Sequence, residues 1–221
     1  MSTLKIFLSA WEEEYSVACA RLDIFNPEIT AALSPCQKTL FASSFYHIRG
    51  HFFEFLCRLA SRAPSNTYKQ VILANITEEL GEDLKSHEQL YAEFAYRLDV
   101  DTVTEFLTPS SNFDYTEYFN KAHLEWILSK DWGRAWAAFC AYERLDNVDY
   151  RNLYALALSF NVDEAALLFF KGHAEIGHFD ATFSLLEDEW RKDPQAIKDG
   201  FQFIAQNQLL VWQNLNNTLF A

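Results

Sequence analysis

The chain has 221 residues, half of them hydrophobic, so it is long enough for one sizeable core and too apolar for a disordered protein. Its formal net charge of −13 at pH 7 argues against binding to nucleic acid or to an anionic membrane surface, both of which need a basic patch. No break in composition divides the chain, so we expect a single domain over residues 1–221.

The cysteines and the N-terminal segment bear on the compartment. The four cysteines lie far apart and form no CxxC pair, which favours a reducing compartment over a zinc cage or a disulfide framework. The short apolar run Ile6-Phe7-Leu8 is soon followed by three glutamates at 12–14, a pattern typical of neither a signal peptide nor a membrane span. We therefore expect a cytoplasmic protein with no membrane segment.

Apolar residues recur with helical spacing along the whole chain. The expected helices cover residues 3–25, 29–33, 35–62, 66–80, 86–98, 101–107, 115–129, 132–145, 148–160, 162–190 and 194–220. No stretch sustains an alternation of period two, and Gly and Pro are scarce, so no sheet is expected. Antiparallel helices with short connections predict a compact all-α bundle.

Several ionisable side chains fall on the apolar stripes of these helices, which predicts that they face the interior. They are Glu79 (or Glu78, after a modest shift of its helix), His87, Glu143, His173 and Asp180. Buried acids and imidazoles are costly unless they satisfy one another. A divalent iron or manganese ion held by carboxylate and imidazole would remove that cost. The alternative is a set of separate buried pairs, each His on a backbone carbonyl and each acid on an Arg or Tyr.

Two further motifs contain histidine at spacings that can bind metal. His47 and His51 are four residues apart among aromatic residues, where we favour a pocket wall with Tyr46 or His47 touching a ligand. The segment 175–178 has the ExxH pattern of di-iron bundles, but its Glu175 lies on the side opposite His173 and reads as solvent-facing. There is no Gly-rich phosphate loop and no GxSxG nucleophile motif.

Four blocks, in this order, carry a resemblance to a known superfamily. They are Phe45-Tyr46-His47 with the segment 58–64, the segment 75–81 with His87, Ala141-Tyr142-Glu143, and the segment 168–173. They resemble the helical haem-oxygenase-like fold. Within it, they are similar to the iron-dependent oxidases and oxygenases grouped with the chlamydial death-domain-associating protein and pyrroloquinoline-quinone synthase.

The resemblance implies iron ligands at Glu79, His87, Glu143 and His173. Members that bind two irons end with His-x3-Asp-x3-His on the late helix, but this chain has Gly177 and Ala181 at the two later positions. Asp180 would lie on the inner face beside the lost His position and partly substitute for it. One iron, two irons or none is therefore open.

The implied function is a non-haem iron oxygenase or oxidase that uses dioxygen on a small, largely apolar or amine-bearing metabolite. Tyr46, His47 and Tyr142 would contact the substrate or relay protons. The main alternative is a non-catalytic member that binds a ligand or partner through a degenerate metal site, and a cofactor-free oxidase is a third option. A homodimer is compatible with the sequence.

Overall fold

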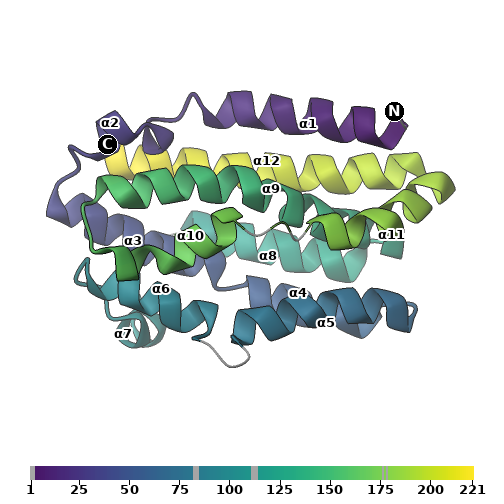
Figure 1. Cartoon of the computed structure of the whole chain (residues 1–221), viewed down its shortest axis with the longest axis horizontal. Coiled ribbons are helices and arrows are strands. Elements are labelled where there is room, and N and C mark those ends of the chain that lie inside the picture. Colours follow the sequence, from purple (N-terminus) through teal and green to yellow (C-terminus); the bar gives the residue numbers. More distant parts are fainter. Residues whose placement is uncertain (1–2, 82–84, 111–113, 176, 178) are drawn as a thin grey trace.

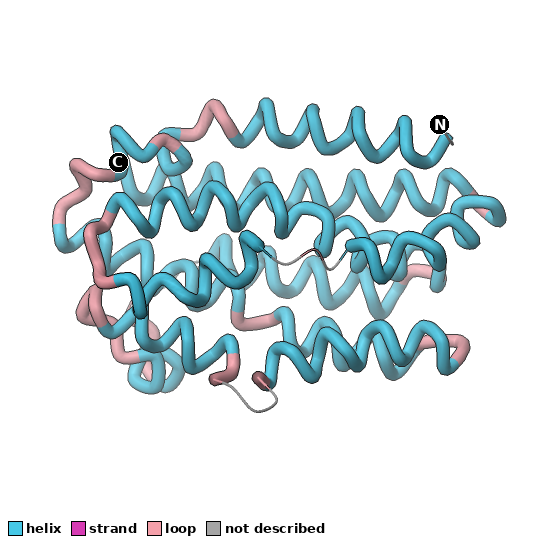
Figure 2. The backbone as a smooth tube through the Cα atoms, viewed as in Figure 1, coloured by secondary structure: helices cyan, strands magenta, loops and turns pink. Residues whose placement is uncertain are grey.

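Helix is the only regular element in the described part of the chain, which confirms the all-α prediction (Figure 2). The structure is a computed structural model that describes residues 3–81, 85–110, 114–175, 177 and 179–221. Its helices are α1 (Thr3–Cys19), η1 (Asp23–Phe25), α2 (Pro27–Thr30), α3 (Pro35–Arg49), α4 (Phe52–Arg62), α5 (Asn66–Leu80), α6 (His87–Tyr96), α7 (Thr102–Leu107), α8 (Asp114–Ser129), α9 (Trp132–Ser159), η2 (Glu164–Leu167), α10 (Leu168–Glu175), α11 (Phe179–Lys192) and α12 (Pro194–Phe220).

The two longest helices, α9 and α12, run side by side along the long axis, with α1 outside α12 and with α4 and α5 at the opposite edge (Figure 1). Gly200 on α12 permits this close packing. A Cβ atom there would lie 2.6 Å from Cβ of Ala137 and 2.8 Å from the backbone oxygen of Arg134. Most of α9 is buried from Ala135 to Leu145, so the helix forms the centre of the core.

Several predicted boundaries are wrong: the helix expected over 3–25 ends at Cys19, the one expected over 29–33 is Pro27–Thr30, and three further differences lie near the centre of the fold. Residues 132–159 form one helix, α9, because the expected connection at 146–147 contains no Gly or Pro to end it. The predicted helix 35–62 is divided around Gly50 into α3 and α4. The predicted helix 162–190 is divided too, since Gly177 lies outside helix between α10 and α11.

The turn between α5 and α6 places two candidate site residues next to each other. Gly81 ends α5 with a φ of 85°, a left-handed conformation that costs glycine nothing. A Cβ atom there would meet the backbone of Lys85 and Ser86 at 2.6 Å. Ser86 then starts α6 with a capping box that includes Gln89. As a result Glu79, near the end of α5, faces His87, at the start of α6.

Among the described helices, none combines the length and apolar character needed to cross a membrane.

Candidate metal centre

Glu79, His87 and His173 come together from α5, α6 and α10. Each offers one donor atom, and the three atoms lie within 4.8 Å of one another. Nδ1 of His87 is 3.0 Å from Oε1 of Glu79, and the rings of His87 and His173 have centroids 4.3 Å apart. We call these residues the three-donor site. The sequence placed the same residues on inward faces.

His173 is oriented as a metal ligand would be. Its Nδ1 lies 2.8 Å from the backbone oxygen of Phe169. Because a carbonyl only accepts, Nδ1 carries the proton and Nε2 keeps its lone pair. The ring of Tyr150 stacks on the imidazole at 4.2 Å and 18°, which fixes the plane of the ring. Burial, together with the neighbouring His87, lowers the pKa of His173 to about 3, so the imidazole is neutral at physiological pH.

The Glu79–His87 pair also fits a divalent cation. Oε1 of Glu79 and Nδ1 of His87 are 3.0 Å apart, so one divalent ion could be held by this carboxylate and imidazole together. Burial acts to raise the pKa of Glu79, but the hydrogen bond and charge of His87, with His173 and Arg49, outweigh it and leave the pKa below its usual value. Glu79 is thus an ionised carboxylate, the form that binds metal.

Glu143 on α9 adds an unsatisfied carboxylate. It is 1% exposed, and within the described structure its Oε2 has no hydrogen-bond partner. It lines a cavity of about 10 Å³ together with all members of the three-donor site, although its oxygens lie outside that 4.8 Å group. We call this space the acidic cavity, lined by Phe52, Asn75, Glu78, Glu79, His87, Glu143, Asp146 and His173. Burial raises the pKa of Glu143 well above normal, and the charges of Asp146 and Glu79 add to the effect. Such an orphaned carboxylate beside three donors fits a bound cation.

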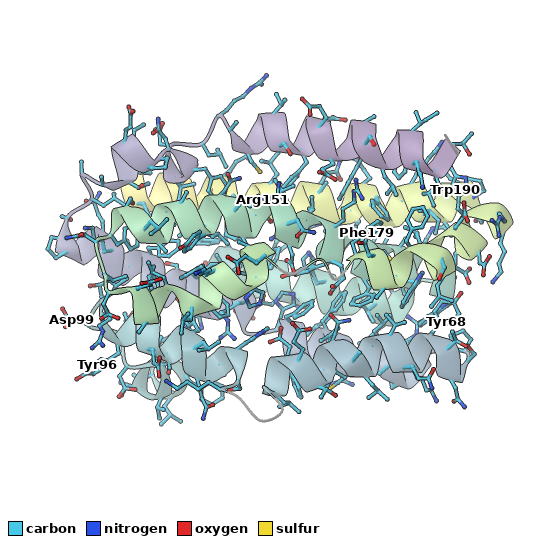
Figure 3. All side chains as sticks on the ribbon, viewed as in Figure 1. Tyr68, Tyr96, Asp99, Arg151, Phe179 and Trp190 are labelled. Atoms are coloured by element: carbon cyan, nitrogen blue, oxygen red, sulfur yellow. The ribbon has the colours of Figure 1, made fainter. Side chains whose placement is uncertain are left out.

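A second cavity, of about 30 Å³, adjoins the same residues. We call it the tyrosine-lined cavity, bounded by Arg49, Phe52, Glu79, Tyr142, Asp146, Tyr150, Phe169 and His173. Tyr142, which was predicted to contact the substrate or relay protons, therefore lies in the wall of this cavity. A wider surface hollow of about 390 Å³ lies away from these residues and is lined by α6 and the η2 region. Its lining includes Tyr96, which is labelled in Figure 3.

Sequence reasoning missed Asp146 and Arg49. Asp146 is buried and lines both cavities, one helical turn after Glu143. The sequence could have predicted the position of Asp146, because residues 145–148 contain no Gly or Pro and a helix that continues through them puts residues 143, 146 and 150 on one face. Arg49 stacks over the rings of Tyr91 and Phe169 at 5.0 and 5.1 Å and pairs with Glu88 at 2.7 Å. Nothing in the sequence distinguished it from a surface arginine.

Tyr46 and His47 are not among the residues that line either cavity, contrary to the prediction. The phase of α3 turns Arg49 toward the site and His47 toward α7, where its Nε2 lies 2.9 Å from Glu105. His51 does not join His47 either. Its Nδ1 donates to the backbone oxygen of Ile48, and its Nε2 is 3.1 Å from Nδ1 of His123. His47 is therefore paired with a carboxylate on α7, and His51 with a backbone carbonyl and a second imidazole, so the two histidines do not share a site.

Asp180 was expected on the inner face, but it is exposed and stands outside the three-donor group. The prediction assumed one continuous helix from His173 through Gly177 to Asp180. In the structure α10 ends at Glu175, and a separate helix, α11, begins at Phe179 (labelled in Figure 3). Gly177 and Ala181 are also exposed. Glu175 is exposed, as expected, and His178 lies outside the described residues.

Comparison with known proteins identifies the family and the fold. A family model described as iron-containing redox enzyme matches residues 39–181. A CADD-like protein of unknown function from Nostoc punctiforme PCC 73102 has a similar crystal structure, with a TM-score of 0.74 and 15% identity over 98% of this chain and 100% of that chain. A second structure of a CADD-like protein from that organism gives a TM-score of 0.69 and 14% identity over 97% of this chain and 96% of the other.

A domain of unknown function with a heme oxygenase-like fold, from Shewanella denitrificans OS217, gives a TM-score of 0.76 and 13% identity over 100% of this chain and 95% of that chain. At these identities the likeness shows the fold, which is the haem-oxygenase-like fold expected from the sequence. No curated protein matches significantly. Since the family model spans well over half of the 221 residues, the chain belongs to the family of iron-containing redox enzymes.

Proposed function

We propose that this protein is a non-haem iron-dependent oxidase or oxygenase that acts on a small metabolite with dioxygen as co-substrate. The observation that carries the proposal is the three-donor site: one carboxylate and two imidazoles within 4.8 Å of one another, facing a buried cavity. Such a mixed oxygen and nitrogen donor set suits iron. Membership of an iron-containing redox family supports the same metal.

Glu79, His87 and His173 would hold the ion, with Glu143 as a further carboxylate in the same cavity. Iron, when bound, supplies the redox chemistry with dioxygen. The protein's own part is to present the donors: the Phe169 carbonyl holds the proton on Nδ1 of His173, and so leaves Nε2 free. Binding at Nδ1 of His87 requires that nitrogen to be without its proton, so ion uptake at this atom would release the proton or move it to Nε2.

The walls of the tyrosine-lined cavity would exclude water and select the substrate. Phe52, Tyr150 and Phe169 give it aromatic faces, while Glu79 and Asp146 give it acidic groups. Aromatic rings and carboxylates together favour an amine-bearing substrate. About 30 Å³ is room for an ion or one or two molecules the size of water, and a metabolite site is roughly ten times larger. Substrate entry would therefore require wall side chains to move.

The test is a titration of metal-free protein with ferrous iron under nitrogen, followed by dioxygen uptake in the presence of small amines. Tight iron binding that is lost in His173→Ala but kept in His47→Ala supports the proposal, because only His173 lies at the three-donor site. Equal binding by His173→Ala and the unaltered protein would contradict it. Iron binding with no dioxygen uptake would favour the non-catalytic alternative, which the small cavity volumes also suit.

A further inference from the structure

Arg49, the last residue of α3, places a cation in the wall of a cavity that is otherwise lined by aromatic rings, acids and a neutral imidazole. Among the described residues, it is the one guanidinium or ammonium group that lines the tyrosine-lined cavity, where Glu79 and Asp146 supply the carboxylates. The side chain of Arg49 is only 12% exposed. Because an arginine is rarely buried this far unless it is paired, the nature of its partner decides what it does.

The partner of Arg49 in this structure is open to exchange. Nη1 of Arg49 lies 2.7 Å from Oε2 of Glu88, but the side chain of Glu88 is 54% exposed. An ion pair with so well hydrated a carboxylate contributes little, so Glu88 can turn into water at small cost. The bond to Glu88 starts from one nitrogen of a guanidinium that carries five N–H donors.

The guanidinium is also held by contacts that do not involve Glu88. Its central carbon lies 5.0 Å from the ring centroid of Tyr91 and 5.1 Å from that of Phe169, and both rings are buried. Tyr91 is fixed in turn, because its hydroxyl donates to the backbone oxygen of Ala42. Two aromatic faces therefore hold the charge in place. A planar fork of donors fixed in this way matches the geometry of a carboxylate.

We propose that Arg49 anchors a carboxylate group of the substrate, which takes the place of Glu88 on the guanidinium. The inference rests on the proposed function and narrows its substrate class. Asp146, in the same cavity wall, would receive the amine. The substrate is then a small amino acid, whose two charges cancel and add no net charge to a buried site. Because Glu88 faces solvent and Arg49 faces the cavity, the exchange would occur where the substrate enters.

The experiment measures, by titration calorimetry, how two matched series of probes bind to full-length protein with iron(II) added under nitrogen. One series is alanine, propionate and ethylamine, and the other is phenylalanine, phenylpropionate and phenylethylamine. In each series the acid lacks only the ammonium group and the amine lacks only the carboxylate. In at least one series the amino acid should bind most tightly.

The variants should change these affinities in opposite directions. Arg49→Gln should weaken binding of the amino acid and the acid by about 10- to 100-fold, as expected for a hydrogen bond between charged groups, and leave the amine unchanged. Glu88→Gln should strengthen binding of the same two probes, because it removes the competing carboxylate. Asp146→Asn should weaken the amino acid and the amine but not the acid. Arg58→Gln is the matched control, since Arg58 is an exposed arginine that also pairs with a glutamate, and it should change nothing.

Three results would overturn the carboxylate anchor. An equal loss of all three probes in Arg49→Gln would mean that this arginine only supports the fold. Unchanged affinity for the acids in Glu88→Gln would mean that no exchange takes place, and a probe that binds to the ion alone would give this result. Failure of every amino acid and acid to bind at millimolar concentration is the third. If Arg49→Gln does not fold, Glu88→Gln still decides, since its side chain is half exposed.

Uptake of iron(II), measured in the same samples, separates this inference from the proposed function. Iron binding without carboxylate binding that depends on Arg49 would overturn the anchor and leave the proposed function standing. Carboxylate binding that depends on Arg49, in protein that takes up no iron, would support the anchor and contradict the proposed function.

Discussion

Glu143→Gln should make the metal-free protein more stable while weakening its stabilisation by metal. The carboxylate is 1% exposed with an unbonded oxygen, and burial raises its pKa well above normal. At pH 8 its ionisation therefore opposes folding. Glutamine has the same shape and no charge, and its amide can donate to carboxylates in the acidic cavity.

The size of the effect follows from the cost of an unsatisfied buried polar group, about 1–3 kcal/mol. For a chain of this length that corresponds to a rise in Tm of about 2–12 °C. Bound metal should instead stabilise the unaltered protein more than the variant. At 100 times its Kd, a bound ion adds about 2.7 kcal/mol to the free energy of unfolding of the unaltered protein. Glu143→Gln should gain clearly less from the same manganese(II) concentration.

The assay is urea unfolding at pH 8, with and without manganese(II), for both proteins. Glu175→Gln is the matched control, since an exposed charge should change stability by no more than about 0.5 kcal/mol. A metal-free Glu143→Gln protein that is less stable than the unaltered one would refute the reasoning, because it would mean that the buried carboxylate has a stabilising partner.

Three further predictions concern other parts of the chain. Burial raises the pKa of Asp149 to about 7, whereas an Asp in the unfolded chain has a pKa near 3.9. Between these two pH values the folded protein keeps a proton on Asp149 that the unfolded chain has released. Stability relative to Asp149→Asn should therefore fall as pH rises from about 4 to 7, by up to about 1.4 kcal/mol per unit in urea titrations, and a constant difference would argue against it. Gly200→Ala should lower the free energy of unfolding by about 1–3 kcal/mol, since its Cβ would lie 2.6 Å from that of Ala137; unchanged urea stability would contradict the close helix contact. Asp180→Asn should leave the affinity for iron(II) unchanged in an anaerobic titration, and a marked loss would place Asp180 at the ion after all.

The helical periodicity of the sequence was sufficient for the fold class and for much of the site. Each of Glu79, His87, Glu143 and His173 lies within one uninterrupted helical segment, so counting by threes and fours from apolar neighbours gave the right face. Their convergence could not come from periodicity, because it depends on how α5, α6, α9 and α10 pack. The expectation that these side chains meet came from the order of the motifs that resemble the family.

The wrong predictions occurred where a helix was extended across a residue that is not helical or was ended before its true end. Asp180 was placed by counting across Gly177, which is not helical, and Asp146 was overlooked because a break was assumed before it. The position of His47 depended on its contact with Glu105, 58 residues away, which local spacing does not contain. Tertiary contacts of this kind decide which of two faces of a short helix turns toward the site.

We infer that Glu79, His87 and His173 would hold one metal ion. The most direct test is a crystal structure of protein loaded with iron(II) under nitrogen, with anomalous difference maps measured on both sides of the iron absorption edge. We expect an iron peak bonded to these three side chains. Iron bound elsewhere, or no peak at this position in protein saturated with iron, would contradict it.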